Sequence, residues 1–156
     1  MLKFFSVQLF LEHSNLHQQY FSSSILDGDL GTRVLVALSS MNRRKWGKAG
    51  EDLAASFLEQ SGLKVLERNF RFERGEIDLI AEEGEELVFV EVKARRSSIF
   101  GAPEDAVTEK KQEQVHAVAE GYLFMHDIDN RPCRFDIVAI EYRHGTAEIR
   151  HIRDAF

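Results

Sequence analysis

The pattern of apolar residues in the second half of the chain limits the folds that are available to it. Residues 87–94 and 135–141 are short, largely apolar segments typical of β-strands, and residues 103–125 between them have the spacing of an amphipathic helix. A connection of this length that contains a helix joins parallel neighbours in a sheet through a right-handed crossover. We therefore expect an α/β fold with a mixed sheet.

The segments on either side of this crossover supply the rest of the sheet. The acidic turn around Gly84 joins the strand over residues 87–94 to the strand before it as a hairpin. Gly62 marks the end of the first helix. The remaining elements are a helix over residues 50–59 and strands over residues 64–72, 76–81 and 147–152. The expected order is helix, three strands, helix and strand, followed by a short last strand.

Residues 1–40 differ in character from the rest of the chain. They hold only two basic residues, Lys3 and Arg33, and their apolar residues keep no single period. At Met41 the sequence changes to a basic run followed by a helix pattern. We interpret residues 1–40 as an N-terminal extension that is poorly ordered or precedes the true start, and residues 41–156 as one domain. A helix or strand packed on the domain is the alternative.

The bulk composition excludes some classes of protein. No segment approaches the roughly 20 apolar residues of a membrane span, and a single cysteine, Cys133, cannot form an internal disulfide. The single cysteine favours a reducing compartment, and we expect the cytoplasm. The formal net charge of −6 is unusual for a nucleic-acid-binding protein. Four acidic residues crowd around Gly84 in what we interpret as a solvated turn: Glu82, Glu83, Glu85 and Glu86.

The candidate catalytic residues lie on the hairpin formed by residues 76–81 and 87–94. Side chains alternate along a strand, so Glu91 and Lys93 share a face within an otherwise apolar strand. Burying such a pair is costly and is seldom needed for packing. Ile77, Leu79 and Ala81 point to one face of their strand, which leaves Asp78 on the other. The register that avoids an unpartnered carboxylate among valines pairs Asp78 with Glu91.

Two carboxylates beside a lysine suit the hydrolysis of phosphodiester bonds. Carboxylate oxygens, with the peptide oxygen of Val92, would bind Mg²⁺, with Mn²⁺ as the alternative. Lys93 would position the attacking water or neutralise the phosphate, and Glu51 on the first helix is a fourth candidate. The structural alternative is a Glu91–Lys93 ion pair beside an unrelated Asp78. The role of Glu76 is open: it assists the site or pairs with Arg74.

The chain resembles the YraN family of small, uncharacterised bacterial proteins. The resemblance runs from about Arg43 to Phe156 and is carried by the segments Trp46–Ala54, Gly75–Ile80, Phe89–Arg95 and Arg134–Ala139. This family is related to archaeal Holliday junction resolvases and to the PD-(D/E)XK nucleases. The resemblance implies a restriction-endonuclease-like αβββαβ core with a mixed central sheet flanked by helices. It also implies that Glu51, Asp78 and Glu91 are metal-ligand positions and that Lys93 is the catalytic lysine.

This resemblance predicts a metal-dependent endonuclease that acts on branched or damaged DNA, as a homodimer where two strands must be cut. The alternatives are a nucleic-acid-binding module with little or no turnover, and a protein-interaction scaffold with structural carboxylates. Arg134 and Asp136 fit a sheet-stabilising pair better than a catalytic role. The candidate contacts to nucleic acid are Arg43, Arg44, Lys48, Arg74, Arg95, Arg96, Lys110 and Lys111.

Overall fold

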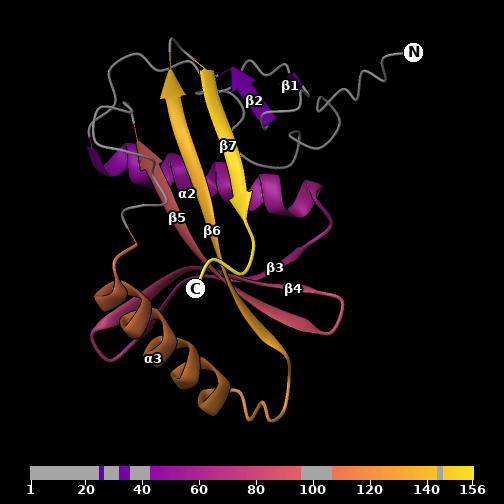
Figure 1. Cartoon of the computed structure of the whole chain (residues 1–156), viewed down its shortest axis with the longest axis vertical. Helices are drawn as coiled ribbons and strands as arrows, with labels where there is room; N and C mark the ends of the chain where they lie inside the picture. The colour runs from indigo at the N-terminus through magenta and orange to yellow at the C-terminus, as the bar shows by residue number, and fades with distance from the viewer. Residues whose placement is uncertain (1–24, 27–31, 36–42, 96–106, 144–145) are drawn as a thin grey trace.

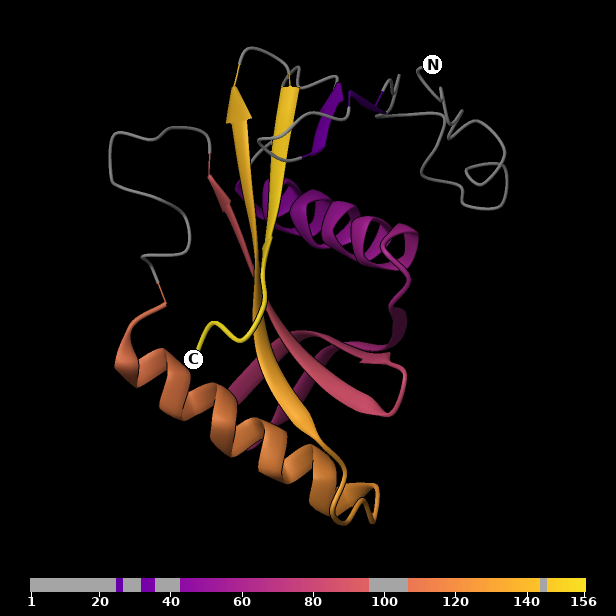
Figure 2. The same ribbon diagram turned by 45° about the vertical axis from the view of Figure 1, so that its right-hand side comes forward.

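A computed structural model describes residues 25–26, 32–35, 43–95, 107–143 and 146–156. Its centre is a seven-stranded sheet in the order β1-β2-β7-β6-β5-β4-β3, and the two helices lie on opposite sides of it (Figures 1 and 2). The elements are β1 Ile25–Leu26, β2 Thr32–Leu35, α2 Arg43–Gln60, β3 Lys64–Phe72, β4 Gly75–Glu83, β5 Glu86–Arg95, α3 Glu109–Met125, β6 Cys133–Arg143 and β7 Thr146–Ile152.

The crossover predicted from the sequence is confirmed. Strands β5 and β6 run parallel, with Phe89 beside Phe135 and Glu91 beside Ile137, and α3 connects them. The other pairings in the sheet are antiparallel. The chain is therefore an α/β protein with a mixed sheet and the αβββαβ order that was expected.

Helix α2 begins at Arg43, well before the predicted start at residue 50, and ends in a Schellman motif. Gly62 has a φ of 96°, a conformation that costs glycine little. The amide of Leu63 donates to Leu58 O at 3.0 Å, and that of Gly62 donates to Glu59 O at 3.1 Å. These two bonds satisfy carbonyls that the end of the helix leaves without partners. Both leucines are buried, so the motif also packs the helix end into the core.

Each face of the sheet forms its own core with one helix. Leu53, Ala54 and Leu58 of α2 pack on one face with strand residues such as Val88 and Val90. Residues of α3 pack on the other face with Phe89, Leu87 and Ile80; they are Val115, Val118, Ala119 and Tyr122. Strand β5 is therefore covered on both faces.

Helix α3 starts later than the sequence pattern suggested. Its N-cap is Thr108, whose side chain accepts a hydrogen bond from the amide of Lys111, so the helix begins at Glu109. Pro103, the expected first-turn residue, lies outside the described residues. A threonine hydroxyl satisfies amides that the first turn leaves without partners, and this explains why the helix starts here.

Two short strands lie within the N-terminal segment. Strand β2 extends the sheet by pairing antiparallel with β7, and β1 pairs with β2. The rest of residues 1–40, and Met41, lie outside the described residues. Neither described helix is long and apolar enough to cross a membrane.

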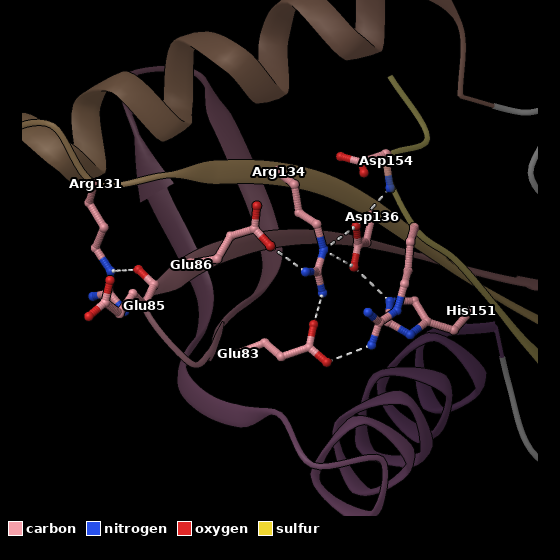
Figure 3. Close-up of polar contacts among 9 residues, drawn as sticks. Glu83, Glu85, Glu86, Arg131, Arg134, Asp136, His151 and Asp154 are labelled. Carbon is pink, nitrogen blue, oxygen red and sulfur yellow. Dashed lines mark hydrogen bonds and ion pairs between the residues drawn. The ribbon is translucent and has the colours of Figure 1, made fainter.

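The acidic hairpin between β4 and β5 has the exposed turn that the sequence indicated, with Gly84 and Glu85 exposed, and its carboxylates also form ion pairs. Glu82 forms ion pairs with Lys64 and Arg131, both at 2.9 Å. Glu83 forms ion pairs with Arg134 and Arg153, both at 2.6 Å (Figure 3). The hairpin is thus attached to the strands on either side and to the segment after β7.

Arg134 connects this hairpin to the interior of the sheet. Its guanidinium contacts Glu86 at 2.5 Å and both oxygens of Asp136 at 3.1 Å. Asp136 is fully buried, and it also accepts hydrogen bonds from His151 at 2.7 Å and from the Asp154 amide at 3.1 Å. Burial alone would raise the pKa of Asp136, but these hydrogen bonds lower it overall. The expected role of Arg134 and Asp136 in stabilising the sheet fits these contacts.

The contact between α3 and β3 gives a test of this packing. A Cβ at Gly121 would lie 2.3 Å from the Phe72 ring, so we expect Gly121→Ala to destabilise the protein by roughly 1–3 kcal/mol. A Cβ at Gly47 on α2 would meet nothing within 4 Å. Gly47→Ala is therefore the matched control, and we expect it to be neutral or stabilising by up to about 1 kcal/mol. Urea unfolding of both variants measures the difference.

Candidate functional site

The candidate site lies where β4 separates from β5. Their ladder runs from Glu83–Glu86 to Leu79–Val90 and then ends. Beyond it, the start of β4 stays paired with β3, and the end of β5 stays paired with β6. Continuing the register by one residue places Asp78 opposite Glu91, as the sequence analysis expected. The Asp78 carboxylate accepts a hydrogen bond from the Val92 amide at 2.7 Å, so a side chain bridges the two strands at this fork.

The alternation of side chains along β4 breaks at Asp78. Ile77 packs in the core on the α3 side, whereas Leu79 and Ala81 pack on the α2 side. The expectation that Ile77 and Leu79 share a face was therefore wrong. Because the alternation is interrupted at this point, the Asp78 side chain points toward β5 and not into either core.

Glu91 is a buried carboxylate held between two lysines. Its side chain is only 3% exposed. Lys93 donates a hydrogen bond to Oε1, and Nζ of Lys111, from the first turn of α3, lies 3.1 Å from Oε2. The contact with Lys111 lacks the geometry of a hydrogen bond, so among the described residues Oε2 is a buried oxygen with no hydrogen bond. The Glu91–Lys93 ion pair of the structural alternative is present, but Asp78 lies beside it and is not unrelated.

The electrostatics of Asp78 differ from those of an ordinary ion-paired aspartate. Burial raises its pKa, and the negative charge of Glu91 raises it further, to about 7. The Val92 amide and Lys93 oppose this shift, whereas Glu51 adds to it. Asp78 and Glu91 therefore repel one another in a poorly solvated space, and the nearby Lys93 offsets only part of this effect on Asp78.

Glu51 reaches this region from α2 and is held there by a residue that the sequence analysis missed. Asn69 Nδ2 donates to Glu51 Oε2 at 3.0 Å. Asn69 has a φ of 54° within β3, at the position opposite Asp78 in the register of β3 and β4. Left-handed backbone conformations are costly for residues other than glycine and are more frequent for asparagine. In the sequence, the one sign of this role is that residue 69 is an asparagine, a residue type that adopts left-handed conformations more often than most.

The carboxylates of Asp78 and Glu91 suit a divalent cation whose remaining ligands are waters or substrate oxygens. No three His, Cys, Asp or Glu side chains converge on one point within the described parts of the chain. The carboxylates available together are those of Asp78 and Glu91, and Oε2 of Glu91 still lacks a hydrogen bond. Mg²⁺ commonly binds one or two carboxylates and completes its shell with waters and substrate phosphates. The donor set therefore fits Mg²⁺, whereas Glu51 stays bonded to Asn69.

The other expected site residues are dispersed. Glu76 pairs with Arg71 at 2.8 Å and not with Arg74. Lys48, Arg74 and Lys110 are exposed, and Arg95 is half-buried at the end of β5. Arg43 and Arg44 lie in the first turn of α2, but their side chains, like the whole of Arg96, lie outside the described residues. Of the basic candidates with described side chains, Lys111 contacts the carboxylates.

Fold and site together define an α/β protein with a restriction-endonuclease-like core and a carboxylate–lysine cluster at the fork of its sheet. Residues 50–140 match the model of uncharacterised protein family UPF0102. The chain belongs to this family, which is the YraN family suggested by its sequence.

Several bacterial UPF0102 proteins are similar over most of the chain. The protein from Moorella thermoacetica is 41% identical over 119 residues, which cover 75% of this chain and 99% of the relative. The protein from Symbiobacterium thermophilum is 47% identical over 114 residues, covering 72% and 97%. A solved structure, that of Pyrococcus furiosus SfsA in complex with Ca²⁺, is 12% identical, covers 84% of this chain and 74% of that one, and has a TM-score of 0.31. This last similarity is too weak to support an inference.

The raised pKa of Asp78 makes stability depend on pH. The folded protein binds the Asp78 proton more tightly than the unfolded chain does, so this group lowers stability as pH rises from about 4 to about 7. Asp78→Asn removes the titration and keeps an oxygen for the Val92 amide. We expect the variant to be more stable than the wild type at pH 8 by on the order of a few kcal/mol, with the difference vanishing near pH 4. Urea unfolding across this range measures it; lower stability of the variant at pH 8 would contradict the assignment.

The hydrogen bond from the Asn69 side chain to Glu51 can be tested separately from the backbone conformation of Asn69. Asn69→Ala removes the hydrogen bond to Glu51 and leaves a residue that tolerates the left-handed backbone less well, so we expect a loss of about 1–3 kcal/mol. Asn69→Gly also removes the bond but accepts the φ of 54°. Its loss should therefore be smaller. If thermal unfolding showed that both variants lose the same stability, the backbone of Asn69 would not be strained.

Proposed function

We propose that the protein is a metal-dependent nuclease that hydrolyses phosphodiester bonds in DNA, with Mg²⁺ as the cofactor and Mn²⁺ as the alternative. The observation that carries this proposal is the buried Oε2 of Glu91, which lacks a hydrogen bond beside Asp78 at the fork. The Lys111 ammonium lies 3.1 Å from this oxygen but makes no hydrogen bond to it, so the oxygen stays open to a ligand that can replace this contact. The neighbouring lysines favour a ligand that also brings anionic oxygens.

Each residue of the candidate site would have its own role in this reaction. Asp78 and Glu91 would hold the cation, which when bound lowers the pKa of a coordinated water and stabilises negative charge on phosphate. Lys93 would orient the attacking water or neutralise a phosphate oxygen. Burial of Glu91, whose side chain is 3% exposed, strengthens these interactions. Glu51, fixed by Asn69, would contribute negative charge at the margin.

A second candidate is binding of nucleic acid without hydrolysis. The ion pair between Lys93 and Glu91 favours it, because a lysine engaged in this way is not available to the reaction. Symmetric cutting of branched DNA would further require two copies of the chain. Cleavage assays separate the two candidates once binding of the metal is established.

The first test is calorimetric titration of Mg²⁺ and Mn²⁺ into the full chain at pH 8, with and without a non-cleavable oligonucleotide. We expect the wild type to bind metal and Asp78→Asn with Glu91→Gln to lose it, since the double variant lacks both anionic ligands. Glu59→Gln, an exposed position on α2, is the matched control and should bind like the wild type. Branched, single-stranded and duplex DNA are then assayed for cleavage. Absence of metal binding by the wild type under both conditions would contradict the proposal.

A further inference from the structure

A second ammonium group reaches the carboxylate site from α3. Lys111 Nζ lies 3.1 Å from Glu91 Oε2 and donates to the Glu76 carbonyl oxygen at 3.4 Å. Lys93, from β5 itself, occupies the other oxygen of Glu91. One buried carboxylate is therefore neutralised by two lysines that belong to different elements.

The position of Lys111 is set by the packing of α3 and not by the lysine alone. One helical turn further on, Gln114 Nε2 donates to the Arg74 carbonyl oxygen at 3.0 Å. A Cβ at Gly75 would lie 2.2 Å from Cγ2 of Val118, so the start of β4 touches the helix directly. The first turn of α3 is thereby held over the fork where β4 leaves β5.

The two lysines contact Glu91 in different ways. Lys93 makes a hydrogen bond, whereas the contact of Lys111 is ionic and leaves Oε2 without one. An ionic contact supplies charge but does not use the directional lone pair of the oxygen. Oε2 is therefore compensated in charge and still able to accept a ligand.

We propose that Lys111 is the counter-ion of Glu91 in the metal-free protein and that a divalent cation displaces it from Oε2. This inference rests on the proposed function and goes beyond it, because it assigns to Lys111 the control of metal affinity. Lys111 acts through Glu91 and is a positioning residue. Because the ammonium and the divalent cation compete for one oxygen, each weakens the binding of the other.

The charge-removing variant Lys111→Met tests this competition. We expect it to bind Mn²⁺ at least about fivefold more tightly than the wild type in calorimetry. Without metal it should unfold at a lower temperature, because Glu91 then keeps only Lys93, and saturating Mn²⁺ should restore the loss. Lys110→Met removes the same charge from an exposed neighbour and should change neither quantity. If the methionine variant does not fold, Lys111→Gln provides the same comparison.

The outcomes separate this inference from the proposed function. Unchanged or weaker Mn²⁺ binding by Lys111→Met, with the wild type binding normally, overturns the role of Lys111 alone. An equal gain in Lys110→Met also overturns it, since the effect would then come from net charge. A wild type that binds no Mn²⁺, with or without the oligonucleotide, overturns the proposed function together with this inference.

Discussion

The hydrogen bond from the Val92 amide to the Asp78 carboxylate holds the protein together where its sheet divides. On one side of this fork β4 stays with β3, and on the other β5 stays with β6. A buried amide that lost its ladder partner would otherwise be unsatisfied, at a cost comparable to a lost hydrogen bond. Asp78 supplies the acceptor. The carboxylate that ends the ladder is therefore also brought beside Glu91, and the geometry of the sheet creates the candidate site.

The chain contains two buried carboxylate centres that are compensated to different degrees. Asp136 is surrounded by donors from Arg134, His151 and the Asp154 amide, and its pKa is lowered despite complete burial. Burial and the negative charge of Glu91 raise the pKa of Asp78 to about 7, although the Val92 amide donates a hydrogen bond to it. The same fold thus surrounds Asp136 with hydrogen-bond donors and places Asp78 beside a second carboxylate. This contrast between the two centres favours a ligand at the fork and a purely structural role for Asp136.

The parts of this structure that could be predicted from sequence are those with local causes. Alternation along β5 placed Glu91 and Lys93 on one face, and the long helical connection predicted the parallel pairing with β6. The partners of the acidic hairpin could not be predicted, because the arginine that binds Glu83 from beyond β7, Arg153, is 70 residues away in the chain. Asn69 was not among the candidates, and Lys111 was expected to contact nucleic acid and not Glu91. One matters through a backbone angle, and the other through the docking of α3 against the start of β4.

The acidic composition is a weaker argument against an anionic ligand than it first seemed. Glu82 and Glu83 are each paired with two basic side chains, and Glu86 is paired with Arg134. Their charges are largely neutralised where they stand and, beyond a distance of about 8–10 Å, are further screened by salt. A phosphate at the fork would instead meet Lys93, Lys111 and any cation bound by Asp78 and Glu91, at much shorter range. The local arrangement of charge, and not the formal total, therefore decides whether the proposed substrate is attracted to the site.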